Sequence, residues 1–123
     1  MALQITVREC GDVSVLDLSG RSTIDDGESE LLGGHLKKLA DNGVTKLLLN
    51  LSDLTKIDSS GISIIIGTCA FVRRRGGDLK LVCASGRVLE VLIVFRLLEV
   101  ICSFANEDDA LASFGQRGYV AAS

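Results

Sequence analysis

Four consecutive residues near the middle of the chain, Asp58, Ser59, Ser60 and Gly61, are of types that can carry chemistry. They follow the apolar run at residues 46–51 and precede an isoleucine-rich segment with helical spacing. The serines should therefore lie where a helix begins, just beyond the carboxyl end of a sheet strand. Backbone N–H groups and the helix dipole favour an anion there, so the fold would tolerate a phosphate on either serine. Gly61 leaves the first turn open to a partner.

The other residues of reactive type point to no catalytic or metal site. His35 is the one histidine that could activate a serine, and no Gly-x-Ser-x-Gly elbow is present, so the sequence disfavours a serine hydrolase acting through Ser59. The four cysteines are Cys10, Cys69, Cys83 and Cys102. Their spacing matches no zinc pattern, and we expect free thiols in a reducing compartment, with Cys69 and Cys102 acting as small apolar residues. We therefore predict no enzyme activity, no metal and no cofactor.

Composition indicates one compact domain covering residues 1–123. Apolar residues make up 47% of the chain, enough for a core, and the net charge is −3. A chain with this negative net charge does not attract the phosphate backbone of DNA or RNA, so nucleic-acid binding is disfavoured. The first ten residues lack the basic segment and the long apolar stretch that are typical of a secretory signal peptide. Residues 88–104 are strongly apolar but short and interrupted by charges, so we expect a buried helix and strand, no membrane insertion and a cytoplasmic protein.

Strand and helix patterns alternate along the chain after an initial antiparallel hairpin. The predicted strands are residues 3–8, 13–18, 46–51, 79–83 and 100–104, with Gly20 ending the second. The predicted helices are residues 27–42, 60–74, 85–95 and 107–114, the last capped by Asn106. This order indicates an α/β fold with a mixed β-sheet, in which the hairpin is followed by βα repeats with parallel strands and four helices. Gly33 and Gly34 indicate either a close neighbour or a loose turn in the first helix.

The segment LNLSDLTKIDSSGISIII resembles the signature of STAS (SpoIIAA-like) domains, the anti-sigma factor antagonists. RRRGGDLKLV and EDDALASF resemble later parts of the same family, so the resemblance extends over nearly the whole chain. It implies a non-enzymatic binding module whose unphosphorylated form binds an anti-sigma factor that is also a serine kinase, which releases the sigma factor. Phosphorylation of Ser59 would end this binding, and a serine phosphatase would restore it.

The resemblance also implies which residues surround the phosphorylation site. Partner contacts are expected from Thr23, Ile57, Asp58, Ser60 and Gly61. Thr23 departs from the aspartate that is common in the family at that position. Asp58 either repels a phosphate or caps the helix, and both roles stay open, whereas Ser60 is expected to be the structural cap. The plainer alternative for Ser59 is that it only caps the helix.

The apolar segment 88–95 leaves a second hypothesis open. Its apolar residues surround most of the helix, so one face should pack on the sheet and the rest should be exposed unless a partner covers it. A homodimer would cover it, and so would a larger assembly such as a stress-signalling particle or a lipid-transport complex. Deep burial is the plain alternative. The arginines at 73–75 are expected to be a solvated helix end, or else to contact an anionic partner.

Overall fold

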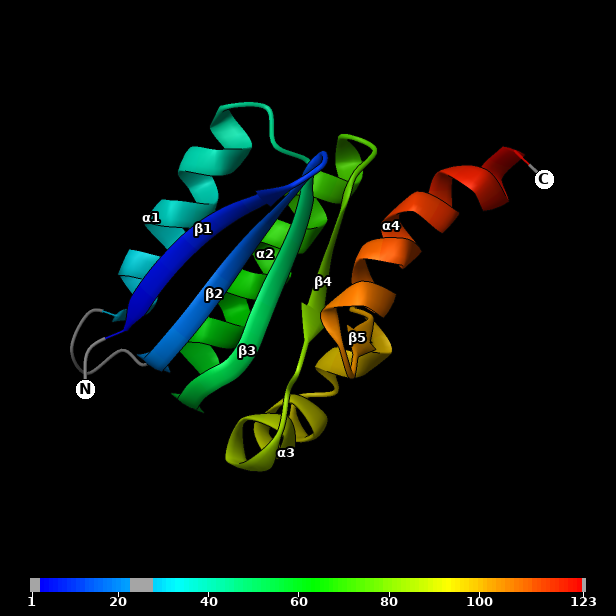
Figure 1. The fold of residues 1–123 in the computed structure, drawn as a ribbon. Helices are drawn as coiled ribbons and strands as arrows, with labels where there is room; N and C mark the ends of the chain where they lie inside the picture. The colour runs from blue at the N-terminus through cyan, green and yellow to red at the C-terminus, as the bar shows by residue number, and fades with distance from the viewer. Residues whose placement is uncertain (1–2, 23–27, 123) are drawn as a thin grey trace.

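The computed structural model describes residues 3–22 and 28–122, with side chains for residues 3–20 and 30–114. Five strands form one mixed sheet in the order β1-β2-β3-β4-β5 (Figure 1). The strands are β1 (Gln4–Cys10), β2 (Val13–Ser22), β3 (Lys46–Ile57), β4 (Asp78–Val82) and β5 (Ser103–Phe104). The helices are α1 (Glu28–Asp41), α2 (Ser59–Arg74), α3 (Gly86–Val94) and α4 (Glu107–Ala122), with a short 3₁₀ turn at Leu97–Glu99.

The strand directions confirm the predicted α/β class. β1 and β2 pair antiparallel as a hairpin, and the pairs β2–β3, β3–β4 and β4–β5 are parallel. Parallel neighbours need crossover connections, which α1, α2 and α3 provide. The fold is therefore a mixed sheet with an N-terminal hairpin followed by βα repeats and four helices.

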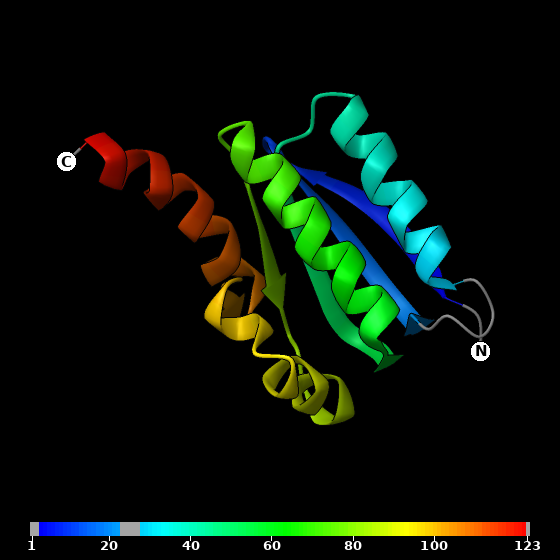
Figure 2. The ribbon, with the colours of Figure 1, turned by 180° about the vertical axis from the view of Figure 1, so that it is seen from behind.

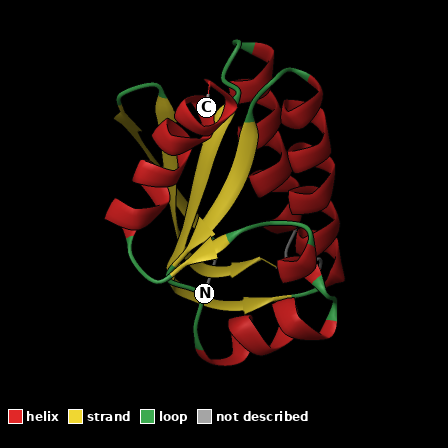
Figure 3. Ribbon diagram, turned by 90° about the vertical axis from the view of Figure 1, so that its right-hand side faces the viewer, coloured by secondary structure: helices red, strands yellow, loops and turns green. Residues whose placement is uncertain are grey.

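Helices cover the sheet on both faces. Figure 2 shows α1 and α2 side by side on one face, and Figure 3 shows the helix that ends at the C-terminus on the other. Leu47 and Leu49 of β3 belong to the larger core beneath α1 and α2, whereas Leu48 belongs to the smaller core that includes Phe114 of α4. Burial on both faces explains the unbroken leucine run, because successive strand residues point to opposite faces.

Packing explains one of the three glycines that lie in α1 or directly precede β4. A Cβ atom on Gly33 of α1 would lie 3.4 Å from Cδ1 of Ile64 in α2, whereas one on Gly34 would meet nothing within 4 Å. Gly33 thus faces α2 at ordinary contact distance, and the described atoms show no packing reason for Gly34. A Cβ atom on Gly77 would overlap the carbonyl oxygen of Thr45, so only glycine fits the turn that leads into β4.

The lengths of β2, β3 and β5 differ from those predicted. β3 continues to Ile57 rather than ending at Leu51, because its backbone stays paired with β2 up to Ser22 although Ser52 and Asp53 are exposed. Gly20 therefore does not end β2, and the pairing shifts register next to it. β5 has only two residues, because the chain forms a turn and a bend at Val100 and Ile101 after the 3₁₀ turn at Leu97–Glu99, and it becomes a strand only at Ser103. Cys102, expected to be buried, is exposed.

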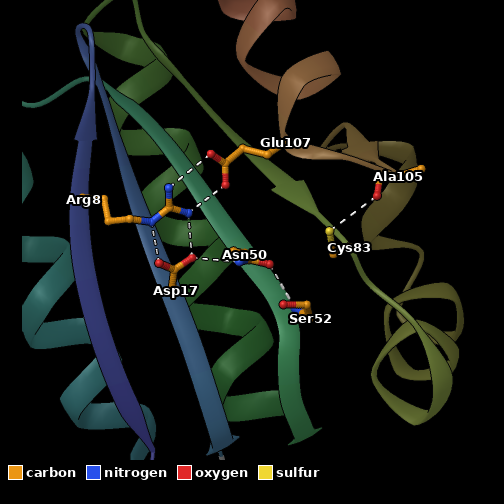
Figure 4. Close-up of polar contacts among 7 residues, drawn as sticks. All are labelled: Arg8, Asp17, Asn50, Ser52, Cys83, Ala105 and Glu107. Carbon is orange, nitrogen blue, oxygen red and sulfur yellow. Dashed lines mark hydrogen bonds and ion pairs between the residues drawn. The ribbon is translucent and has the colours of Figure 1, made fainter.

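A polar network joins the hairpin to α4 (Figure 4). The guanidinium of Arg8 in β1 donates to both carboxylate oxygens of Asp17 in β2, at 2.6 and 2.9 Å, and to both oxygens of Glu107 in α4, at 3.2 and 2.7 Å. Asn50 of β3 also donates to Asp17, at 2.7 Å. The hydrogen bonds from Arg8, with a smaller contribution from Asn50, lower the pKa of Asp17. The network ties the first turn of α4 to β1.

We predict that Arg8→Met lowers the free energy of unfolding by about 1 kcal/mol at pH 7, a modest loss because the site is partly exposed. Since the folded state lowers the pKa of Asp17, this stabilisation is complete above about pH 4 and disappears as the pH falls through the lowered pKa. Urea unfolding between pH 7 and pH 2 should therefore show wild type and variant converging in acid.

Arg96→Met is the matched control, because the Arg96–Glu99 pair is a local surface pair with both side chains mostly exposed. It should change stability little at any pH. An Arg8→Met difference that stays constant down to pH 2 would show that packing of the arginine stem, rather than the ion pairs, holds the hairpin.

Candidate functional site

Ser59 is positioned by the strand that precedes it and the helix that it begins. β3 ends in a buried residue, Ile57, whose exposed fraction is 3%. Asp58 has extended backbone angles, φ −120° and ψ −173°, and α2 starts at Ser59. Ile62 and Ile65 of α2 are buried in the core beneath the sheet. Buried residues on both sides therefore hold Ser59 at the carboxyl end of β3, where it is exposed.

The cap of α2 is Asp58. One oxygen of its carboxylate accepts hydrogen bonds from the backbone N–H groups of Ser60, at 3.0 Å, and Gly61, at 3.4 Å, and from the hydroxyl of Ser60. The expectation that Ser60 is the structural cap is therefore wrong: an aspartate one residue before the helix accepts from the free amides, and Ser60 donates to it. Of the two roles left open for Asp58, capping is the one that the contacts support.

The two serines differ in what their hydroxyls can do. Ser60 is half-buried and its hydroxyl is bound to Asp58. Ser59 is exposed, and within the described part of the chain no hydrogen bond involves its side chain. A partner could therefore reach the hydroxyl of Ser59 without breaking a hydrogen bond to any described residue, whereas the hydroxyl of Ser60 is bound to Asp58.

The cap changes what an added phosphate would meet. The N–H groups of Ser60 and Gly61 already bind Asp58, so fewer free donors remain at the helix start than the sequence indicated. A phosphate on Ser59 would place about −1.5 to −2 charges next to a carboxylate. The dipole of α2 favours that charge, and no acidic residue lies in the first turn of α2. Modification would thus produce a concentrated negative site at the surface.

The remaining predicted site residues are spread over different environments. Gly61 and Ile57 are buried, so Ile57 offers a partner only the edge of its side chain. Thr23 lies outside the described residues. His35 is half-buried on α1, with Nδ1 3.1 Å from the carbonyl oxygen of Leu31, and no hydrogen bond joins it to Ser59 in the described ranges. The structure therefore gathers Asp58, Ser59, Ser60 and Gly61 into one site and does not add the histidine to it.

Sequence analysis did not identify the groove beside this site. A groove of about 500 Å³ lies between the end of β3 and α3. Its lining residues are Thr55, Lys56, Ile57, Arg87 and Val91. The groove could not be found from sequence, because the predicted strand ended at residue 51 and residues 52–57 were expected to form a loop. The groove instead lies between the last residues of the longer strand and α3.

The mixed sheet, its N-terminal hairpin and its two helical layers define a small α/β domain that presents one serine at a helix start. Three comparisons place it among known proteins. The family model described as "STAS domain" matches residues 4–110, and the chain belongs to this family.

Known antagonists of anti-sigma factors resemble the chain over most of its length. The anti-sigma-B factor antagonist of Bacillus subtilis (strain 168) is 28% identical over 101 residues, which are 82% of this chain and 90% of that protein. A solved structure of a putative anti-sigma factor antagonist from Thermotoga maritima superposes with a TM-score of 0.82 at 22% identity, covering 89% of this chain and 93% of that one. The structure of the antagonist SpoIIAA in its unphosphorylated form gives 0.68 at 19% identity, covering 95% and 99%. The structures support the fold alone.

We predict that Asp58→Ala destabilises the protein by about 1 kcal/mol, because three donors at the start of α2 lose their acceptor. Asp58→Asn should cost less, since its side-chain oxygen still accepts. Ser59→Ala is the matched control, and its midpoint in thermal or urea unfolding should stay within about 0.5 kcal/mol of wild type. If Ser59→Ala proves as destabilising as Asp58→Ala, then the Ser59 hydroxyl stabilises the fold and is not free for a partner.

Proposed function

We propose that this protein is an anti-sigma factor antagonist of the partner-switching type. It is a non-enzymatic binding module acting in the cytoplasm. Its unphosphorylated form binds an anti-sigma factor that is also a serine kinase, and this binding releases the sigma factor. Phosphorylation of Ser59 ends the binding, and a serine phosphatase restores it. The observation that carries the proposal is the exposed hydroxyl of Ser59, which makes no hydrogen bond to the described residues, next to an acidic cap in a chain of the STAS family.

The physical basis of the switch is a change of charge at one surface point. A partner that covers Ser59 must remove water from it, and removing water from a phosphate costs far more than from a hydroxyl. The carboxylate of Asp58 lies beside Ser59 and cannot neutralise the phosphate. A penalty of about 3–4 kcal/mol corresponds to a 10²- to 10³-fold loss of affinity. The fold itself need not change.

Membership of a larger assembly is the second candidate. Four large apolar side chains at the end of α3 and beyond it are exposed: Ile93, Val94, Phe95 and Val100. Such a cluster is typical of a surface that another protein covers. Part of the predicted burial is confirmed, because Val88 and Leu92 are in the core and Leu89 and Val91 are half-buried, whereas residues 93–95 are exposed. Among the residues described, no helix is long and apolar enough to span a bilayer.

The first experiment maps phosphorylation. Purified protein is incubated with ATP and each anti-sigma factor kinase encoded in the same genome, and modified peptides are identified by mass spectrometry. We expect one phosphate, on Ser59, because its hydroxyl is exposed and makes no hydrogen bond within the described ranges. Ser59→Ala should abolish the modification and Ser60→Ala should retain it. A phosphate on Ser60 in wild type, or none with any kinase, contradicts the proposal.

The second experiment measures the effect of charge on binding. Ser59→Asp should bind the phosphorylating kinase at least tenfold more weakly than wild type, and the phosphorylated protein 10²- to 10³-fold more weakly, as measured by calorimetry. Ser52→Asp, at an exposed position of β3, is a charge-matched control and should bind like wild type. Equal affinity of Ser59→Asp and wild type would reject the switch and favour the assembly, which needs no charge change at Ser59.

A further inference from the structure

The groove between β3 and α3 begins immediately before the phosphorylation site. Ile57, one of its lining residues, precedes Asp58, and the groove extends along α3 through Arg87 and Val91. Figure 1 shows α3 at the end of the sheet to which the arrows of β2 and β3 point. A partner that covers Ser59 therefore has this groove next to its footprint.

Both charged residues of the groove are cations. Lys56 and Arg87 are exposed, and no carboxylate contacts Lys56 within the described residues. Arg87 has one carboxylate nearby, that of Glu90 at 4.0 Å, and both of these side chains are more than 70% exposed. Such a pair is weak and gives way to a better partner. The groove is therefore locally basic in a chain whose net charge is −3.

Apolar side chains lie between and beyond these cations. Ile57 is buried and presents its edge to the groove, and Val91 is half-buried. Val94 follows Val91 by one helical turn, so it continues the same side of α3, and its exposed fraction is 76%. The surface thus combines an apolar strip, Ile57, Val91 and Val94, with two positive charges at its start.

We propose that this groove binds an acidic amphipathic segment of the partner. The apolar side chains of that segment contact Val91 and Val94, and its carboxylates pair with Lys56 and Arg87. The inference rests on the proposed function, because the occupant is a segment of the protein that covers Ser59. Charge complementarity sets the choice: Lys56, which no described carboxylate contacts, and Arg87, whose pair with Glu90 is long and exposed, select acidic side chains and disfavour basic ones. A phosphate on Ser59, three residues from Lys56, would repel the same carboxylates.

The test uses two helical peptides of 16 residues and the ¹⁵N-labelled protein. One peptide has leucine at every third or fourth position and glutamate between, and the other has lysine in place of each glutamate. In an NMR titration, the glutamate peptide should shift the amides of Ile57, Arg87 and Val91, and it should bind at least tenfold more tightly than the lysine peptide. Raising the salt concentration from 50 to 300 mM should weaken binding of the glutamate peptide, because salt screens exposed charge pairs.

Lys56→Ala/Arg87→Ala should lower the affinity for the glutamate peptide roughly tenfold. Lys37→Ala/Arg74→Ala is the control with the same change of net charge at exposed positions of α1 and α2, and it should leave the affinity unchanged. Thermal unfolding of both variants excludes loss of structure as the cause. Equal binding of the two peptides, shifts confined to other surfaces, or a dimer of this chain that the groove variant abolishes would each overturn the proposal.

The peptides do not require Ser59 to be a phosphorylation site, so the two ideas can fail separately. If Ser59→Asp weakens kinase binding and the groove variant leaves it unchanged, the switch stands and the acidic segment is rejected. If the groove variant loses the glutamate peptide and Ser59→Asp binds the kinase like wild type, the groove stands without the switch.

Discussion

The carboxylate of Asp58 decides which of two neighbouring serines is available at the surface. It accepts from the amides of Ser60 and Gly61 and from the hydroxyl of Ser60. A helix start must satisfy its free N–H groups, and here a residue outside the helix does so. The hydroxyl of Ser59 is therefore not needed for the cap. The same carboxylate also places a fixed negative charge beside any group added to Ser59, so stability and electrostatics at this site depend on one side chain.

The cap is effective only because its two flanking elements are anchored. β3 lies between β2 and β4 and contributes buried leucines to the cores on both faces of the sheet. α2 is fixed from its first turn by Ile62. Rigid elements on both sides keep the surface around Ser59 constant when a charge is added. The proposed switch would need no conformational change, because the difference in binding would arise from desolvation of the added charge.

Sequence patterns predicted most of this architecture and missed local details that depend on neighbours. The hairpin, the parallel strands and the position of Ser59 followed from periodicity and from the family signature. The extension of β3 to Ile57 did not, since Ser52 and Asp53 interrupt the apolar pattern while the backbone stays paired with β2. Ser60 was preferred as the cap because propensity does not distinguish adjacent Asp and Ser; their hydrogen bonds do. The exposed Cys102 was misplaced because the chain turns and bends at Val100 and Ile101, so the strand begins only at Ser103.

The same extension of β3 accounts for the basic groove. A loop at residues 52–57 would leave Lys56 among other surface charges, whereas a strand brings it beside Arg87 of α3. Two cations are then next to the acidic cap and the exposed hydroxyl of Ser59, so charges of both signs lie close together. Adding a phosphate to Ser59 shifts this balance toward negative charge without moving the backbone. A partner whose carboxylates pair with these two cations would be repelled by the phosphate. Phosphorylation of Ser59 would then lower the affinity of the groove for that partner.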